Sequence, residues 1–277
     1  MIIEEPLYGM LENIFGDPLK ATVKNLIELG NEYFKELKDF EIKIVYRGEC
    51  SLPKIFLING FLQKHEKIDD WLESINQKFP NHTKLHVDWD SRNLNDFSLE
   101  LPNIIQFGNS IPTFIINMWY RAYINAGKAG VILASEILKR KHNYEYIFMG
   151  HSLGSRVAYY AAEKLAEQKF NRLHSMYLLS GAVGNKDWEK IAKIVKHRIY
   201  NFYSKEDNVL SYLYRASSAW LTEEPIGISR IDMHSKKVKN YEVTKYLEPY
   251  IGSCSLLHMC FKKALKDILK KIDQNNK

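Results

Sequence analysis

Short apolar runs alternate with amphipathic stretches along most of the chain. The runs EIKIVYR and KIFLING, separated by GECSLP, predict two strands joined by a turn. Downstream, stretches with apolar residues at helical spacing separate further apolar runs. The expected helices lie near 67–79, 120–141, 153–169, 187–196, 208–220 and 255–272, and the expected strands are 84–90, EYIFMG, SMYLLSGA, HRIYNFYS and VKNYEVT.

Strict alternation of strands and helices is typical of parallel strands joined by right-handed crossovers. We therefore expect an α/β fold with a doubly wound, mostly parallel sheet and helices on both faces. Apolar residues at helical intervals over 18–39 predict a helical N-terminal arm within residues 1–40. No internal repeat or low-complexity linker is visible, so residues 1–277 are expected to form a single domain.

The composition is that of a folded protein with a mild excess of positive charge. Lys and Arg number 39 against 33 Asp and Glu, and the lysines are scattered except in the C-terminal KKALKDILKK. That segment could contact an anionic membrane or nucleic acid or form a solvated helix face, and no nucleic-acid partner is expected. Cys50, Cys254 and Cys260 lack any C-x-x-C spacing, and neither a metal nor a cofactor is expected. Free thiols and an N-terminus without a signal-peptide pattern predict a cytoplasmic location.

One serine stands where a strand is expected to end and a helix to begin. Gly150, Ser152 and Gly154 form G-x-S-x-G within YIFMGHSLGSRV, which is the context of a nucleophile elbow. Such a turn strains the serine backbone, and side chains larger than glycine two positions away would collide. The elbow would place the hydroxyl at the carboxyl edge of the sheet, beside a helix N-terminus. Ser152 is thus the predicted nucleophile, and a serine packed in a tight turn is the alternative.

A serine nucleophile needs a histidine base and an acid to orient it, in the chain order serine, acid, histidine. Asp207 directly follows an expected strand and is the predicted acid; its alternative role is the N-cap of the helix that follows. Glu206 and Asp187 are the reserve candidates.

Four histidines follow the serine in the chain. His174 and His197 lie in strand-like runs and are interpreted as structural. His258 comes after the last expected strand and is preferred as the base over His234, with a partly buried helix histidine as its alternative role. His151, next to the nucleophile, is interpreted as a structural hydrogen-bonding residue.

The oxyanion of the tetrahedral intermediate needs backbone donors. One should be the N–H of Leu153, and the other should come from the glycine turn in LINGFLQ, through Phe61 or Leu62, with Gly60 allowing close approach. An ordinary strand-to-helix turn is the alternative interpretation.

Residues 101–120 are uncharged over a membrane-spanning length. Their prolines, asparagines and glutamine are costly in hydrocarbon, which argues against a transmembrane helix. A lid or acyl-chain surface over the active site is the functional interpretation, and core packing is the alternative.

Five segments, LINGFL, LHVDWDS, GHSLGSRVAYY, YLLSGAV and NFYSKEDNVLSYLYRASS, resemble the α/β-hydrolase superfamily in this order and spacing. More narrowly they resemble the hydrolase group that includes the transmembrane and coiled-coil domain-containing proteins, over roughly residues 53 to 262. The resemblance implies Ser152 as nucleophile, Asp207 as acid and His258 as base, the set already reached from the residues.

The expected activity is hydrolysis of carboxylic esters with apolar or lipid-like acyl groups, through an acyl-enzyme on Ser152. Thioesterase, acyltransferase or peptidase chemistry could use the same residues. Two alternatives from other classes are a non-catalytic interaction protein with this fold and a peripheral membrane-binding protein that uses residues 101–120 and the basic C-terminal helix.

Overall fold

The structure is a computed structural model that describes residues 36–37, 39–64, 68–92, 113–140, 142–185, 187–217, 224–254 and 256–275. Contacts divide the chain into two units, Met1–Leu37 and Lys38–Lys277. The expected N-terminal arm falls almost entirely outside the described residues. The single-domain organisation stays a prediction.

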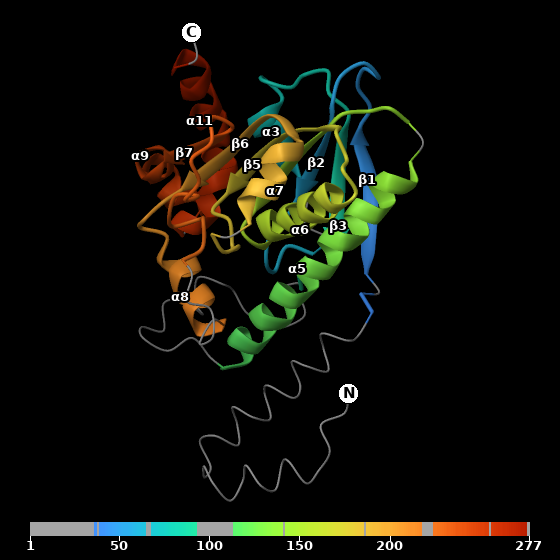
Figure 1. Ribbon diagram of the computed structural model, residues 1–277. Helices are drawn as coiled ribbons and strands as arrows, with labels where there is room; N and C mark the ends of the chain where they lie inside the picture. The colour runs from blue at the N-terminus through green and yellow to red at the C-terminus, as the bar shows by residue number, and fades with distance from the viewer. Residues whose placement is uncertain are drawn as a thin grey trace, which may run out of the picture. The chain divides into compact units, whose positions relative to one another are not determined.

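Seven strands of the second unit form one sheet in the order β1-β3-β2-β4-β5-β6-β7 (Figure 1). Neighbouring strands from β3 through β7 pair in parallel. The central strands are apolar on both faces because helices cover both. The strands are β1 (Phe40–Tyr46), β2 (Lys54–Ile58), β3 (Lys84–Trp89), β4 (Tyr146–His151), β5 (Leu173–Leu179), β6 (Val195–Tyr203) and β7 (Val238–Glu242).

Helices lie on both faces of this sheet. Figure 1 shows α5, α6 and α7 across one face and α3 and α11 on the other. On the first face α6 contacts both α5 and α7, and on the second α3 contacts α11. The helices are α3 (Asp69–Ile75), α5 (Thr113–Lys139), α6 (Leu153–Glu167), α7 (Trp188–Ile194), α8 (Asn208–Ser217), α9 (Thr244–Leu247), α10 (Ile251–Cys254) and α11 (Phe261–Asn275), with 3₁₀ turns η2 (Glu248–Tyr250) and η3 (Leu257–Cys260).

The core beneath α3 and α11 is formed by every second residue of the strands that these helices cover. Successive side chains of a strand point to opposite faces, so alternate residues of β2, β4, β5 and β6 meet the apolar sides of the two helices. This core contains Ile55 and Leu57 from β2, Trp71 from α3 and Phe261 and Leu265 from α11, all fully buried. It fixes the position of η3, which immediately precedes α11.

The expectation of a mostly parallel α/β sheet is confirmed, and the sheet with its elbow is an α/β-hydrolase fold. One strand departs from the alternation rule: β1 pairs with β3 in antiparallel orientation. The turn between β1 and β2 does not make them neighbours, because β3 inserts between them. As an edge strand, β1 carries the charged residues Glu41 and Lys43, which discourage pairing with another sheet.

Several predicted helices have different bounds; the helix expected near 67–79, for example, spans Asp69–Ile75. The helix expected at 120–141 begins at Thr113, so the last part of the 101–120 segment belongs to the first turns of α5. The rest of the segment interpreted as a lid over 101–120, residues 101–112, lies outside the described residues. The closing helix expected over 255–272 is divided into η3 and α11, and α11 continues to Asn275.

Candidate active site

Ser152 stands between the end of β4 and the start of α6. Its backbone has φ 55° and ψ −122°, in the left-handed half of conformational space that non-glycine residues rarely adopt. Its N–H donates to the Leu179 carbonyl, 2.9 Å away, and its own carbonyl accepts from Ser155 and Ala182. These bonds hold the residue in the conformation of a nucleophile elbow.

The two glycines of the motif are required by close backbone contacts. A Cβ on Gly150 would lie 2.5 Å from the Gly154 carbonyl oxygen, and a Cβ on Gly154 would overlap the carbonyl oxygen of Ile58 in β2. The glycines let α6 begin directly over the end of the sheet, as the sequence predicted. The elbow thus depends on the lack of side chains at both positions.

Asp207 and His258 are brought together by two chain segments that lie far apart in the sequence. Asp207 follows β6, is fully buried, and accepts a hydrogen bond on Oδ2 from Nδ1 of His258 at 2.7 Å. His258 lies in η3, and 7% of its surface is exposed. Because Nδ1 faces a carboxylate, it carries the proton, and Nε2 is left as the acceptor nitrogen.

Asp207 also caps α8, the alternative role considered for it. Its Oδ1 accepts the N–H of Leu210 at 3.0 Å, in the first turn of that helix. The two roles use different oxygens of one carboxylate. The cap therefore holds the carboxylate in the orientation in which Oδ2 meets His258.

Sequence reasoning missed Ser180, which directly follows β5. Its Oγ donates to Oδ2 of Asp207 at 2.5 Å and lies 3.1 Å from Nδ1 of His258. The position of Ser180 at the carboxyl end of a parallel strand, the edge it shares with Ser152, was the only signal in the sequence that could have pointed to it.

The side chain of His151 supports His258 through a hydrogen bond to the backbone of His258. Its Nε2 donates to the carbonyl oxygen of His258 at 3.0 Å, and the two ring centroids are 4.9 Å apart. Complete burial, with added repulsion from His258 and Lys262, lowers the pKa of His151 well below its usual value, so the ring is neutral. Among the described residues, its Nδ1 has no hydrogen-bond partner.

The hydroxyl of Ser152 is fully buried and has no hydrogen-bond partner among the described residues. The structure thus joins Asp207 to His258 directly, and it holds His258 against His151, the residue next to Ser152. The bond between serine and base is often long in an unliganded site and shortens when substrate binds. The catalytic roles of these residues stay predictions.

The loop after β2 lies against the nucleophile. A Cβ on Gly60 would come within 2.8 Å of the Cβ of Ser152, and the Gly60 N–H donates to Oε1 of Gln63 at 2.9 Å. The N–H of Leu62, predicted as an oxyanion donor, is engaged instead with the carbonyl oxygen of Ser91 at 2.8 Å. Phe61 and Leu153 remain as the candidate donors.

The reserve residues do not reach this cluster through any hydrogen bond in the described part of the chain. His234 has an exposed side chain in the segment before β7, and His174 and His197 pair with each other at ring centroids 5.5 Å apart. Glu206 and Asp187 are both exposed. Among the described residues, no group of His, Cys, Asp and Glu is arranged to hold a metal ion.

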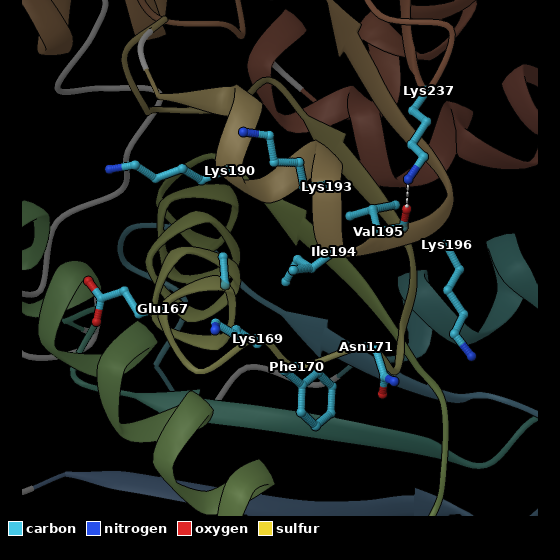
Figure 2. Close-up of a pocket in the computed structure, with 11 residues that line it drawn as sticks. Glu167, Lys169, Phe170, Asn171, Lys190, Lys193, Ile194, Val195, Lys196 and Lys237 are labelled. Atoms are coloured by element: carbon cyan, nitrogen blue, oxygen red, sulfur yellow. Dashed lines mark hydrogen bonds between the residues drawn. The ribbon is translucent and has the colours of Figure 1, made fainter.

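A hollow of about 660 Å³ lies where the segments that lead into β5 and β6 meet (Figure 2). These are the amino ends of parallel strands, whereas Ser152 follows the carboxyl end of β4. Five lysines line it, but the C-terminal ends of α6 and α7 also meet there, where lysine complements the helix dipole. Lys237 makes such a contact with the end of α7, since its Nζ donates to the carbonyl oxygens of Ala192 and Val195. None of the proposed site residues lines the hollow.

Similar curated proteins come from several eukaryotes. A transmembrane and coiled-coil domain-containing protein of Oryza sativa subsp. japonica is 32% identical over 58% of this chain and 23% of its own length. A probable lipase of Saccharomyces cerevisiae is 28% identical over 56% of this chain and 14% of its own length. An uncharacterized membrane protein of Caenorhabditis elegans is 28% identical over 59% of this chain and 26% of its own. The chain thus spans about a quarter or less of these relatives.

These relatives contradict the expected cytoplasmic location. The nematode and rice proteins, and one of Schizosaccharomyces pombe, are named as membrane or transmembrane proteins. Thiol content and a missing signal-peptide pattern were insufficient grounds for that prediction. In the described part of the chain, no helix combines the length and the apolar character that crossing a bilayer requires.

Solved structures similar to the chain include an esterase of Pyrobaculum calidifontis, 12% identical, with a TM-score of 0.40 over 99% of both chains. Another is Est1E of Butyrivibrio proteoclasticus with bound ferulic acid, 11% identical, with a TM-score of 0.40 over 86% of this chain and 96% of that one. A model of one protein family matches residues 98–275, more than half of the chain and a segment that includes Ser152, Asp207 and His258. The chain therefore belongs to DUF726, a family described as proteins of unknown function.

Proposed function

We propose that the chain is a serine hydrolase that cleaves carboxylic esters through an acyl-enzyme on Ser152. The observation that carries this proposal is the 2.7 Å hydrogen bond between buried Asp207 and His258, at the sheet edge where a strained serine begins α6. A carboxylate, an imidazole and a serine at an elbow are the groups that acyl transfer needs.

In the proposed reaction, Oγ of Ser152 attacks the ester carbonyl carbon while Nε2 of His258 takes the hydroxyl proton. Asp207 stabilises the imidazolium that forms. The amides of Phe61 and Leu153 would donate to the oxyanion. Collapse of the intermediate breaks the bond to the leaving alkoxide, which receives the proton from Nε2. Water then attacks the acyl-enzyme by the same route, releasing the carboxylic acid and restoring Ser152.

Apolar residues beside the Gly60 loop support an acyl group of low polarity. The ring of Phe61, half-buried, packs edge-on against Trp119 in the first turns of α5, with centroids 5.2 Å apart. Ile115 and Met118 are buried in the same turns. The yeast relative named as a probable lipase agrees with such a substrate. We therefore propose apolar or lipid-like acyl esters as the substrate class.

The p-nitrophenyl esters of acetate, butyrate and octanoate test both parts of the proposal. We expect kcat/KM to rise with acyl length, because a longer chain buries more apolar surface. Replacing Ser152 with alanine should lower kcat at least about 10⁴-fold, because no nucleophile remains. Ser135→Ala on α5 serves as the control, since its Oγ donates to the Val131 carbonyl of its own helix and, among the described residues, not to the proposed site. Hydrolysis that survives Ser152→Ala would contradict the proposal.

A further inference from the structure

The side chains of Ser180, Asp207 and His258 are hydrogen bonded to one another around the proposed acid. Oδ2 of Asp207 accepts from Oγ of Ser180 at 2.5 Å and from Nδ1 of His258 at 2.7 Å. Ser180 Oγ itself lies 3.1 Å from the same Nδ1. The three polar atoms thus form a closed triangle, and both Ser180 and Asp207 are fully buried.

The hydrogens of this triangle can be assigned from the chemistry of the groups. An ionised carboxylate only accepts hydrogen bonds, so both Ser180 Oγ–H and His258 Nδ1–H point at Asp207. With its single hydrogen used in this way, the Ser180 oxygen offers only a lone pair to Nδ1. Two acceptors therefore surround Nδ1 of His258, and only the tautomer that is protonated at Nδ1 fits.

The strained backbone conformation of Ser180 and its hydrogen bond to β6 hold the Ser180 hydroxyl in place. The residue has φ 44°, a conformation that costs energy for any residue with a Cβ. Its N–H donates to the Phe202 carbonyl of β6 at 2.9 Å. Glycine would adopt this conformation without strain, so the serine at this position is unfavourable for the backbone alone. Its hydroxyl accounts for its presence.

We propose that Ser180 is a positioning residue of the hydrolytic site. It fixes the Asp207 carboxylate and holds His258 in the tautomer whose Nε2 can take a proton from Ser152. This inference rests on the function proposed above, but the interaction itself is a property of the resting protein. Ser180 acts through Asp207 and His258.

The test compares Ser180→Ala, Ser180→Gly and a matched control, Ser175→Ala, in the full chain. Ser175 lies in β5, shortly before Ser180, and is equally buried, but its hydroxyl is paired with His174. Ser180→Gly removes the hydroxyl and also relieves the backbone strain, so it remains folded if the alanine variant does not. The first readout is the low-field proton resonance of His258 Nδ1–H by NMR, identified by its loss in His258→Ala. The second is kcat and KM for a p-nitrophenyl ester.

We expect the Nδ1–H resonance to shift and broaden in both Ser180 variants and to stay unchanged in Ser175→Ala. We expect kcat to fall about tenfold with KM unchanged, because a hydrogen bond to a charged group is lost from the acid and not from the substrate. A resonance that is unchanged in both Ser180 variants would overturn the inference, whatever happens to kcat. If the resonance shifts but the wild-type chain hydrolyses no ester, the proposed function fails and the positioning of His258 by Ser180 stands.

Discussion

Replacing Asp207 with asparagine is expected to lower kcat for ester hydrolysis about 10⁴-fold while leaving the stability of the fold nearly unchanged. The carboxylate has two separable roles, with Oδ2 on His258 and Oδ1 on the N–H of Leu210. Asparagine keeps an oxygen for the helix cap, but it loses the negative charge that stabilises the imidazolium. Its amide N–H₂ can also donate to Nδ1, which selects the tautomer that cannot accept the serine proton.

Steady-state kinetics and urea unfolding of Asp207→Asn and Asp207→Ala separate the two roles. Both variants should lose activity, but only the alanine variant loses the cap, at about 1 kcal/mol of the free energy of unfolding. Asp207→Asn with near wild-type kcat would show that the acid is elsewhere. Glu206, one residue away and exposed, provides the control as Glu206→Gln, for which we expect no change in kcat.

Replacing Gly154 with alanine should lower the free energy of unfolding by about 4 kcal/mol or more. The new Cβ would overlap the carbonyl oxygen of Ile58, which belongs to a buried strand and cannot move without breaking the sheet. Gly127→Ala is the matched control, since its Cβ would lie 3.7 Å from the ring of Tyr160, an ordinary contact. Gly127 lies inside α5, where alanine is favoured over glycine. The free energy of unfolding of Gly127→Ala should therefore rise by about 0.5 to 1 kcal/mol.

Urea denaturation followed by circular dichroism measures both glycine variants. Equal midpoints for Gly154→Ala and the wild type would mean that α6 does not begin as close to β2 as described. A loss of stability in Gly127→Ala would show instead that the helices of this face tolerate no added methyl group, and the comparison would no longer isolate the elbow.

Much of the sheet was predictable because its strands are local apolar runs. β4 reads YIFMGH and is buried throughout, as a central parallel strand should be. The orientation of β1 was not predictable, since two short runs joined by a turn read the same whether they pair with each other or a third strand inserts between them. That choice depends on the pairing of β1 with β3, a strand distant in the chain, which sets Ile42 opposite Val87 and Ile44 opposite Leu85.

The residues of the candidate site that are marked by chain order and by a position after a strand were predictable from the sequence. Asp207 and His258 were chosen because each follows a strand after Ser152, and the two are hydrogen bonded. The cap and acid roles of Asp207 were treated as alternatives because a sequence does not show which oxygen faces which donor. Ser180 and the engaged amide of Leu62 depend on local turns with φ 44° and 61°, and no residue pattern marked these turns.

Labelling of the full chain with a fluorophosphonate probe tests whether Ser152 is a nucleophile activated by His258. Peptide mass spectrometry locates the adduct, and the labelling rate is compared between the wild type, His258→Ala and His234→Ala. We expect one adduct, on Ser152, formed at the wild-type rate in His234→Ala and at least about 10³-fold more slowly in His258→Ala. An adduct on another residue, or equal rates in the two histidine variants, would contradict this activation of Ser152.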